Sequence, residues 1–260
     1  MIDIGINLGN DSFDHDRDQV LIDAKNAGVE FVIITGSCTE SNDFAPKYAA
    51  QHHTFARATV GIHPHHADTV TKETMATIDE QLAHPMVVAV GETGLDFFRD
   101  ISDRKKQETA FESHLELAIT HNKPLFLHQR DSHTRFLPIL KAYRDSIPGA
   151  VVHCFTDEKK ALFDYLDLDL HIGITGWIAD ERRGTHLLPL ISSIPRDRLM
   201  IETDGPYLLP RNIKPKPKNR RNEPKYLPFV AAKVAEALET SPSDVAAFTS
   251  QTAKNFFRLC

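Results

Sequence analysis

The chain alternates short apolar runs with longer segments in which apolar residues recur every three or four positions. Eight runs have the length and composition of buried β-strands and are bounded by turn residues. They cover residues 2–8, 31–36, 57–62, 87–96, 124–131, 149–155, 171–177 and 199–203. Helical spacing fills the intervals at residues 16–27, 41–52, 72–83, 109–121, 132–144 and 158–166, and returns at 226–238 and 243–259.

This alternation predicts the fold class. Strands that alternate with helices pair in parallel, because each crossover returns the chain to the same end of the sheet. Eight such strands favour closure into a (β/α)8 TIM barrel over an open, doubly wound sheet. A barrel of this kind takes about 250 residues. The chain has 260 and shows no linker before residue 211, so we expect one domain over residues 1–260.

Several of these strands end on side chains that bind metal ions. Glu92, His128, His153 and Asp204 each stand at the end of a different apolar run. Active sites of such barrels lie at the C-terminal ends of the strands. A lone histidine there is more often a hydrogen-bonded core residue, and Glu92 alone is as readily paired with Arg130. Two histidines on neighbouring strands, with a glutamate one strand back, instead favour a metal site and a barrel of the metal-dependent hydrolase type.

Two further histidines, in the segment GIHPHH, follow the third strand. The alternation of the chain directs His63 and His65 to the same side. They are candidates for metal ligands, for phosphate contacts or for simple turn residues. Asp204 has a similar alternative, because the Gly205-Pro206 pair after it is typical of a turn.

One segment is strongly biased in composition. Residues 210–224 read PRNIKPKPKNRRNEP and follow directly on the strand that ends at Asp204. Such stretches are often only stiff, solvated loops. Beside a metal site, however, positive charge suits an anionic substrate such as a nucleic-acid backbone. The candidate backbone contacts are Arg211, Lys214, Lys216, Lys218, Arg220 and Arg221.

Other strand ends carry a second basic loop and several rings. The loop is DERRG at 180–184, after the seventh strand. Each ring alone is best explained by packing, although exposed rings among cations stack the bases of single strands. The rings are Phe97, Phe98, Phe155, Trp177 and Tyr207.

Composition narrows the class of protein. The chain is 41% hydrophobic and 25% charged, as is usual for a soluble globular protein. It has no apolar run long enough to span a membrane and no basic region typical of a signal peptide. Cys38, Cys154 and Cys260 form no CxxC pair, which argues against a disulfide framework and favours the reducing cytoplasm. The net charge of −6 argues against binding nucleic acid through bulk charge but allows a local basic patch. We expect a cytoplasmic monomer.

Other catalytic classes lack their motifs. The chain contains no GxSxG elbow and no Walker loop, and GETGLD lacks the spacing of a dinucleotide fingerprint. His52, His53 and His114 fall in or beside helical stretches, where we expect solvent exposure to explain them.

Seven blocks of sequence together resemble the TatD-type metal-dependent deoxyribonucleases. They are GIHPH (61–65), VGETGLDF (90–97), PLFLHQRD (124–131), HCFT (153–156), IGITGW (172–177), ETDGPYLLPR (202–211) and RRNEP (220–224). Any one block is weak, but the ordered set is specific and covers nearly the whole chain. The resemblance implies a (β/α)8 barrel, a divalent metal, a cytoplasmic location and phosphodiester hydrolysis. It also implies 3′-to-5′ exonuclease action on single-stranded DNA or RNA, with a role in DNA repair or nucleic-acid turnover.

The resemblance also assigns roles by position. Glu92, His128 and His153 match metal ligands of the family, and Asp204 matches a ligand or the catalytic base. His63 and His65 match histidines near the metals. The family favours Mg²⁺, whereas imidazole ligands favour Zn²⁺ or Mn²⁺.

One departure from the family pattern concerns the first strand. Most relatives begin with Asp-x-His-x-His, and those two histidines hold one of two metals. Here Gly5 and Asn7 follow Asp3 in their place, a loss that one branch of the family shares. The departure argues against a tightly held second metal and leaves Asn7 and His63 for a weaker one.

These residues predict a reaction. A bound cation would activate water and polarise the phosphate. Asp204 would accept or orient the water's proton, so that Glu92 and Asp204 are the expected catalytic residues. Contacts to the non-bridging phosphate oxygens are expected from His63, His65 and Arg130.

Two other functions remain open at this point. One is a metal-dependent barrel hydrolase that acts on another substrate, such as an amide, a phosphotriester or an aminoacyl-tRNA ester. A small neutral substrate would leave the basic segment 211–221 without a purpose. The other is a non-catalytic nucleic-acid-binding relative, against which the intact Glu92, His128, His153 and Asp204 argue.

Overall fold

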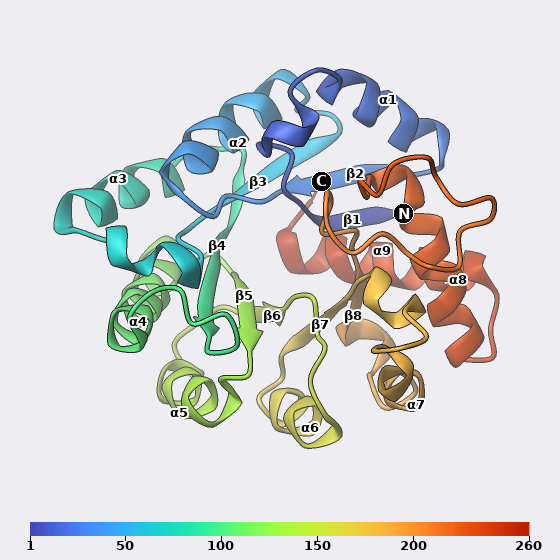
Figure 1. Cartoon of the computed structure of the whole chain (residues 1–260). Coiled ribbons are helices and arrows are strands. Elements are labelled where there is room, and N and C mark those ends of the chain that lie inside the picture. Colours follow the sequence, from blue (N-terminus) through green and yellow to red (C-terminus); the bar gives the residue numbers. More distant parts are fainter. Residues whose placement is uncertain (260) are drawn as a thin grey trace.

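Eight parallel strands form one sheet in chain order in the computed structural model, which describes residues 1–259 (Figure 1). The strands are β1 (Ile2–Ile6), β2 (Phe31–Ile34), β3 (Ala56–Val60), β4 (Val87–Asp96), β5 (Leu125–Arg130), β6 (Ala150–Val152), β7 (His171–Ile174) and β8 (Leu199–Ile201). Every strand predicted from the apolar runs is present, and the TIM barrel is confirmed. Cys260 lies outside the described residues.

The barrel nearly closes where the last strand meets the first. The backbone N–H of Asp204 donates to the carbonyl of Gly5 (2.9 Å), and that of Asn7 donates to the carbonyl of Gly205 (2.8 Å). Below them the buried Asp3 carboxylate accepts from the backbone N–H of Thr203 (2.9 Å) and from its hydroxyl (2.5 Å). This seam between β1 and β8 therefore combines backbone and side-chain hydrogen bonds.

Helices surround the barrel in Figure 1. They are α1 (Arg17–Asn26), α2 (Thr39–Gln51), α3 (Lys72–Leu82), α4 (Arg104–His121), α5 (His133–Tyr143), α6 (Lys159–Asp167), α7 (Leu188–Ile191), α8 (Leu227–Ala237) and α9 (Pro242–Phe257). Short 3₁₀ helices are η1 (Asp11–Phe13), η2 (Pro64–Thr69), η3 (Gly176–Ala179), η4 (Thr185–Leu187), η5 (Arg196–Arg198) and η6 (Pro224–Tyr226). The sequence missed α7, and it placed the start of α4 five residues late.

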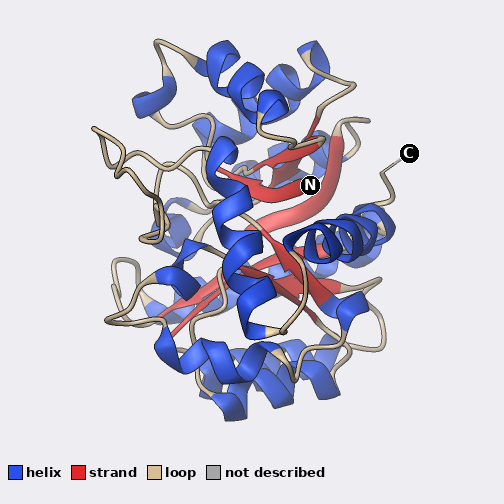
Figure 2. Cartoon of the chain, turned by 90° about the vertical axis from the view of Figure 1, so that its right-hand side faces the viewer, coloured by secondary structure: helices blue, strands red, loops and turns tan. Residues whose placement is uncertain are grey.

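Two apolar clusters hold this architecture together. The larger one lies between the barrel and its helices, where strand residues such as Val32 and Leu127 meet helix residues such as Leu21 and Leu115. The smaller one fills the barrel interior, where Ile4, Phe126 and Met200 pack with Phe257 of α9. Figure 2 shows the helix that leads to the C-terminus on the side opposite the long loops. Helix α9 thus covers one end of the barrel and leaves the other end open.

His114 differs from its sequence-based prediction. Its ring is fully buried, whereas we expected solvent exposure. Nδ1 bonds to the carbonyl of Ala110 (2.6 Å), and Nε2 accepts the backbone N–H of Ile62 (3.0 Å). The prediction was wrong because α4 presents this position to the loop after β3, which the helical pattern alone does not reveal.

Two further findings concern the described residues. Cys38 and Cys154 are free thiols. Within residues 1–259, no helix combines the length and the apolar character needed to cross a membrane.

Candidate active site

A cavity of about 1040 Å³ opens at the C-terminal ends of the strands. This volume slightly exceeds the roughly 300–1,000 Å³ usual for ligand sites. The structure brings the residues predicted from the strand ends together in its wall. They are Asn7, His63, His65, Glu92, His128, Arg130, His153 and Asp204.

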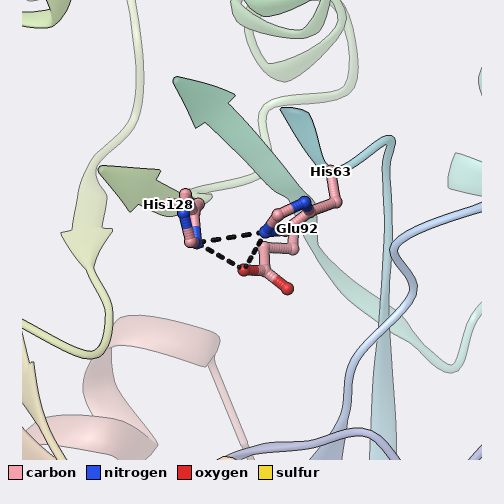
Figure 3. Close-up of side chains that lie close together, drawn as sticks. All are labelled: His63, Glu92 and His128. Atoms are coloured by element: carbon pink, nitrogen blue, oxygen red, sulfur yellow. Dashed lines mark hydrogen bonds and ion pairs between the residues drawn. The ribbon is translucent and has the colours of Figure 1, made fainter. Parts of the chain in front are cut away.

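Three histidine rings converge on one oxygen at the floor of this cavity. Glu92 Oε1 lies 2.7 Å from His153 Nε2, 3.0 Å from His128 Nδ1 and 3.4 Å from His63 Nε2. Figure 3 shows two of these rings, from β5 and from the loop after β3, directed at the Glu92 carboxylate. The ligand atoms of His63, Glu92 and His128 lie within 4.8 Å of one another. One carboxylate surrounded by imidazole nitrogens is a donor set that suits a divalent cation.

The backbone of β4 gives Glu92 this position. The strand continues past the barrel interior to Asp96, and Gly94 pairs with His128 of β5. Gly94 has φ near +141°, and a Cβ there would collide with the carbonyl of His128. Only glycine therefore lets β4 and β5 approach closely enough to bring Glu92 and His128 together.

The charges around Glu92 decide its protonation. Burial alone would raise the pKa of its carboxyl, but His153 and the hydrogen bonds from His128 and His153 outweigh burial and hold that pKa well below its usual value. Burial lowers the pKa of His63 well below its usual value, so its ring is neutral. The floor of the cavity thus carries an ionised carboxylate among imidazoles.

The proton of the His63 ring is fixed by a contact to the backbone. Its Nδ1 accepts the backbone N–H of His65 (3.1 Å) at the start of η2. A neutral ring that accepts at Nδ1 carries its proton on Nε2. His63 Nε2 therefore points into the cavity as a hydrogen-bond donor, whereas a metal ligand needs a free lone pair.

Asp204 stands on the opposite wall, directly after β8. Its backbone is left-handed, with φ near +54°, and its Oδ1 accepts from the side chain of Asn7 (2.9 Å). Burial raises the pKa of Asp204 to about 8, and the carboxylates of Glu92 and Glu202 push it in the same direction. Asn7 thus orients the residue expected to be the base.

Sequence reasoning missed two buried carboxylates behind the rings. Asp96 Oδ2 accepts from His128 Nε2 (3.2 Å), and Glu202 Oε2 lies 3.4 Å from His153 Nδ1. A signal was available for Asp96, because residues four apart on a strand share a face and Glu92 was already assigned. The segment ETD places Glu202 two residues before Asp204 in the same way.

Glu202 also accounts for the glycine at position 5. Its Oε1 accepts the backbone N–H of Cys154 (2.6 Å), and its Oε2 reaches the space beside Gly5. A Cβ at residue 5 would collide with that oxygen. In this chain a buried carboxylate occupies the room that a side chain on β1 would need.

A stacked arginine borders the cavity above His128. The Arg130 guanidinium carbon lies 5.0 Å from the Phe98 ring and 5.2 Å from the Trp177 ring, and Nη1 donates to the Thr156 hydroxyl (2.6 Å). Phe98 is 60% exposed and Tyr207, another residue of the cavity wall, is 54% exposed. The two remaining rings predicted at strand ends, Phe97 and Phe155, pack in or against the core.

The basic segment begins and ends at the rim. Near its start, Arg211 pairs with Glu181 (Nη2 to Oε1, 2.6 Å), and Arg221 pairs with Asp16 (Nη2 to Oδ2, 2.6 Å) and Glu223 (3.0 Å). Asp180 pairs with Arg182 and Arg183, so the DERRG loop neutralises much of its own charge. Four cations of the segment are exposed and make no ion pair within residues 1–259, namely Lys214, Lys216, Lys218 and Arg220.

Comparisons with known proteins agree with this geometry. Residues 2–258 match the family model described as TatD related DNase. A 3′-5′ ssDNA/RNA exonuclease TatD from Edwardsiella piscicida is 46% identical over 259 residues, which are 100% of both chains. The protein of the same name from Erwinia billingiae (strain Eb661) is 46% identical over 100% of this chain and 99% of its own.

Solved structures show the same likeness. YJJV, a TatD homolog from Escherichia coli K12, has a TM-score of 0.90 at 25% identity and covers 100% of this chain and 98% of its own. A hydrolase TatD family protein from Entamoeba histolytica has a TM-score of 0.89 at 25% identity and covers 98% and 97%.

Proposed function

Because this chain belongs to the family of TatD-related DNases, we propose that it is a metal-dependent 3′–5′ exonuclease acting on single-stranded DNA or RNA. The convergence of three imidazole rings on Glu92 Oε1, at the floor of a large cavity, is the observation that carries this proposal. Such a donor set can hold a cation, and phosphodiester hydrolysis needs concentrated positive charge beside a general base.

The residues at this point fit a divalent cation. Glu92, His128 and His153 would hold it, with Asp204 as a further ligand or as the base. When bound, the cation supplies Lewis-acid activation of water and neutralises charge on the phosphate. Imidazole ligands favour Zn²⁺ or Mn²⁺, and likeness to the family favours Mg²⁺. The second, weaker site expected at Asn7 and His63 would require the His63 ring to release its proton from Nε2, because Nδ1 already accepts the backbone N–H of His65.

The remaining side chains act on the water and on the phosphate. Asp204, held by Asn7, accepts a proton from the attacking water. Its own proton leaves more readily once positive charge is held beside it, because an opposite charge lowers the pKa of a carboxyl. His63 Nε2–H and the Arg130 guanidinium donate to non-bridging oxygens, and His65 assists from the same wall.

Substrate recognition follows from the rim. The exposed Phe98 and Tyr207 rings suit stacking of unpaired bases, which is worth about 1–3 kcal/mol per base. Lys214, Lys216, Lys218 and Arg220, which are exposed and make no ion pair within residues 1–259, would contact the backbone beyond the cavity. Arg211 and Arg221, which we also expected to bind the backbone, hold the segment in place through their ion pairs.

Several further properties belong to the same proposal. Residues 1–260 form one hydrolase domain, which acts as a monomer in the cytoplasm. Its role is DNA repair or nucleic-acid turnover.

The test is digestion of end-labelled oligonucleotides with Mg²⁺, Mn²⁺ or Zn²⁺. We expect a 5′-labelled single strand to shorten stepwise, a 3′-labelled one to release mononucleotide at once, and a blunt duplex to be cut far more slowly. Glu92→Gln is the inactive control.

Other outcomes identify the alternatives. Binding of oligonucleotides without cleavage under any of the three metals would indicate a non-catalytic relative. Hydrolysis of an aminoacyl-tRNA ester with no release from oligonucleotides would indicate the other barrel hydrolase.

A further inference from the structure

Asp96 is a buried carboxylate to which the proposed mechanism gives no role. Its side chain is fully buried at the end of β4, four residues beyond Glu92. Its two oxygens have different partners. Oδ1 accepts the backbone N–H groups of Phe98 (3.1 Å) and Arg99 (2.8 Å), and so it fixes the loop after the strand.

Oδ2 faces the active site instead. It accepts from His65 Nε2 (2.9 Å), Arg99 Nη1 (3.0 Å) and His128 Nε2 (3.2 Å). A carboxylate oxygen that accepts from a ring nitrogen requires the proton on that nitrogen. In a neutral His128 ring the lone pair is then on Nδ1, the atom that lies 3.0 Å from Glu92 Oε1.

We propose that Asp96 is a positioning residue that selects the Nδ1-ligating tautomer of His128 and, through the same oxygen, orients His65 and Arg99 along the cavity wall. This inference rests on the proposed metal site and adds the group that sets its geometry. Carboxylates behind metal-ligating histidines fix the ring and raise its basicity, and their removal typically costs about 10–100-fold in metal affinity.

The competing explanation is that Asp96 only caps its loop. The two explanations can be distinguished because they involve different oxygens: capping uses Oδ1, and positioning uses Oδ2. Asp96→Asn retains an oxygen for the backbone bonds and replaces the other oxygen with NH₂. That amide would donate to His128 Nε2 and force the ring proton onto Nδ1, the nitrogen that must bind the metal.

The first measurement is the affinity of substrate-free protein for Zn²⁺ alone, by calorimetric titration against a competing chelator. We expect Asp96→Asn to bind Zn²⁺ about 10–100-fold more weakly than the wild type. Asp100→Asn is the matched control. Its carboxylate lies on the same loop and bonds the Arg104 guanidinium (2.8 and 3.0 Å), and we expect no change in its Zn²⁺ affinity.

The second measurement reads the tautomer directly, by ¹⁵N NMR of histidine-labelled, Zn²⁺-loaded protein. We expect a protonated Nε2 and a shifted, proton-free Nδ1 for His128 in the wild type. A protonated Nδ1 there overturns the proposal, and this spectrum needs no variant to fold.

The outcomes also separate this inference from the proposed metal site. Wild-type affinity in a folded Asp96→Asn protein, with Zn²⁺ bound at His128, overturns the role of Asp96 and leaves the site standing. No Zn²⁺-induced change at His128 in the wild type overturns the site itself, and the role of Asp96 with it.

Discussion

Asp204 combines three features that bear on its proposed role as the catalytic base. It has a left-handed backbone, one fixed hydrogen bond from Asn7 and a pKa raised to about 8 by burial. Asparagine tolerates the same backbone and retains an oxygen for Asn7. Asp204→Asn is therefore a substitution that removes the proposed proton acceptor with little other change.

For Asp204→Asn we expect kcat on a single-stranded oligonucleotide to fall about 100-fold or more, with little change in KM. The control is Asp197→Asn, an exposed aspartate at the other end of β8. Steady-state kinetics of both variants at saturating metal is the measurement. An unchanged kcat would show that Asp204 is only a turn residue.

His114 makes a prediction about stability instead of activity. Burial lowers the pKa of its ring to about 4 from an ordinary 6.5. Between these pH values the unfolded chain binds a proton that the folded protein excludes. The stability due to neutral His114 is therefore complete above pH 6.5 and is lost as the pH falls toward 4. The gap corresponds to about 3 kcal/mol.

We expect His114→Gln to flatten the fall in unfolding free energy between pH 7 and pH 4.5, while lowering that free energy at pH 7. Urea unfolding at both pH values measures the difference. His53→Gln removes an exposed histidine and is the matched control. Equal slopes in the wild type and His114→Gln would show that the buried ring takes up its proton without cost.

At the scale of elements, the strands were predictable because each is a short apolar run bounded by turn residues. Helix α7 was not, because it has only four residues and includes Pro189. The start of α4 was placed late because its first turn, from Arg104, is charged and carries no apolar stripe. Asp103 begins the helix by accepting the N–H of Lys106 (3.0 Å), and capping residues give a weaker signal than periodicity.

The active site, like the fold, was predictable from the sequence only in part. The C-terminal ends of parallel strands lie at one rim of the barrel, so the sequence could predict that Glu92, His128 and His153 are neighbours. Which nitrogen each ring presents depends on partners such as Asp96, 32 residues from His128 in sequence. The burial of His114 likewise depends on a loop 52 residues away. Spacing along the chain carries no information on such contacts.

The segment 210–224 is the element whose role is most readily tested. We expect replacement of Lys214, Lys216 and Lys218 with Ala to raise KM for oligonucleotides. The salt dependence of binding should become shallower by about 2 in log–log slope, because each single-strand phosphate contact contributes roughly 0.7. Cleavage of a minimal phosphodiester that does not reach the segment should be unchanged.

The matched control removes three exposed lysines from helices α2, α3 and α5, by Lys47→Ala, Lys72→Ala and Lys141→Ala. It changes the net charge equally and should leave the slope as in the wild type. Equal losses in the two triple variants would mean that overall charge, and not this segment, attracts the substrate.

For the whole molecule, a net charge of −6 is compatible with a polyanionic substrate because positively charged side chains are concentrated in one region. Near the rim, Asp180 and Glu181 are paired with arginines. Lys214, Lys216 and Lys218, which make no ion pair within residues 1–259, lie together on one segment whose two ends are held by the ion pairs of Arg211 and Arg221. Local potential, not total charge, then governs the approach of a nucleic acid.

Because the seam joins the first strand to the last, the active site can be completed only late in the synthesis of the chain. Synthesis delivers the N-terminal residues first, so Glu92, His128 and His153 leave the ribosome well before Asp204. Until that residue emerges, Gly5 and Asn7 lack the partners that close the barrel. A nascent chain therefore has neither the seam nor the proposed base. We therefore expect an enzyme proposed to degrade single strands to stay inactive at least until synthesis has passed Asp204 and the seam can close.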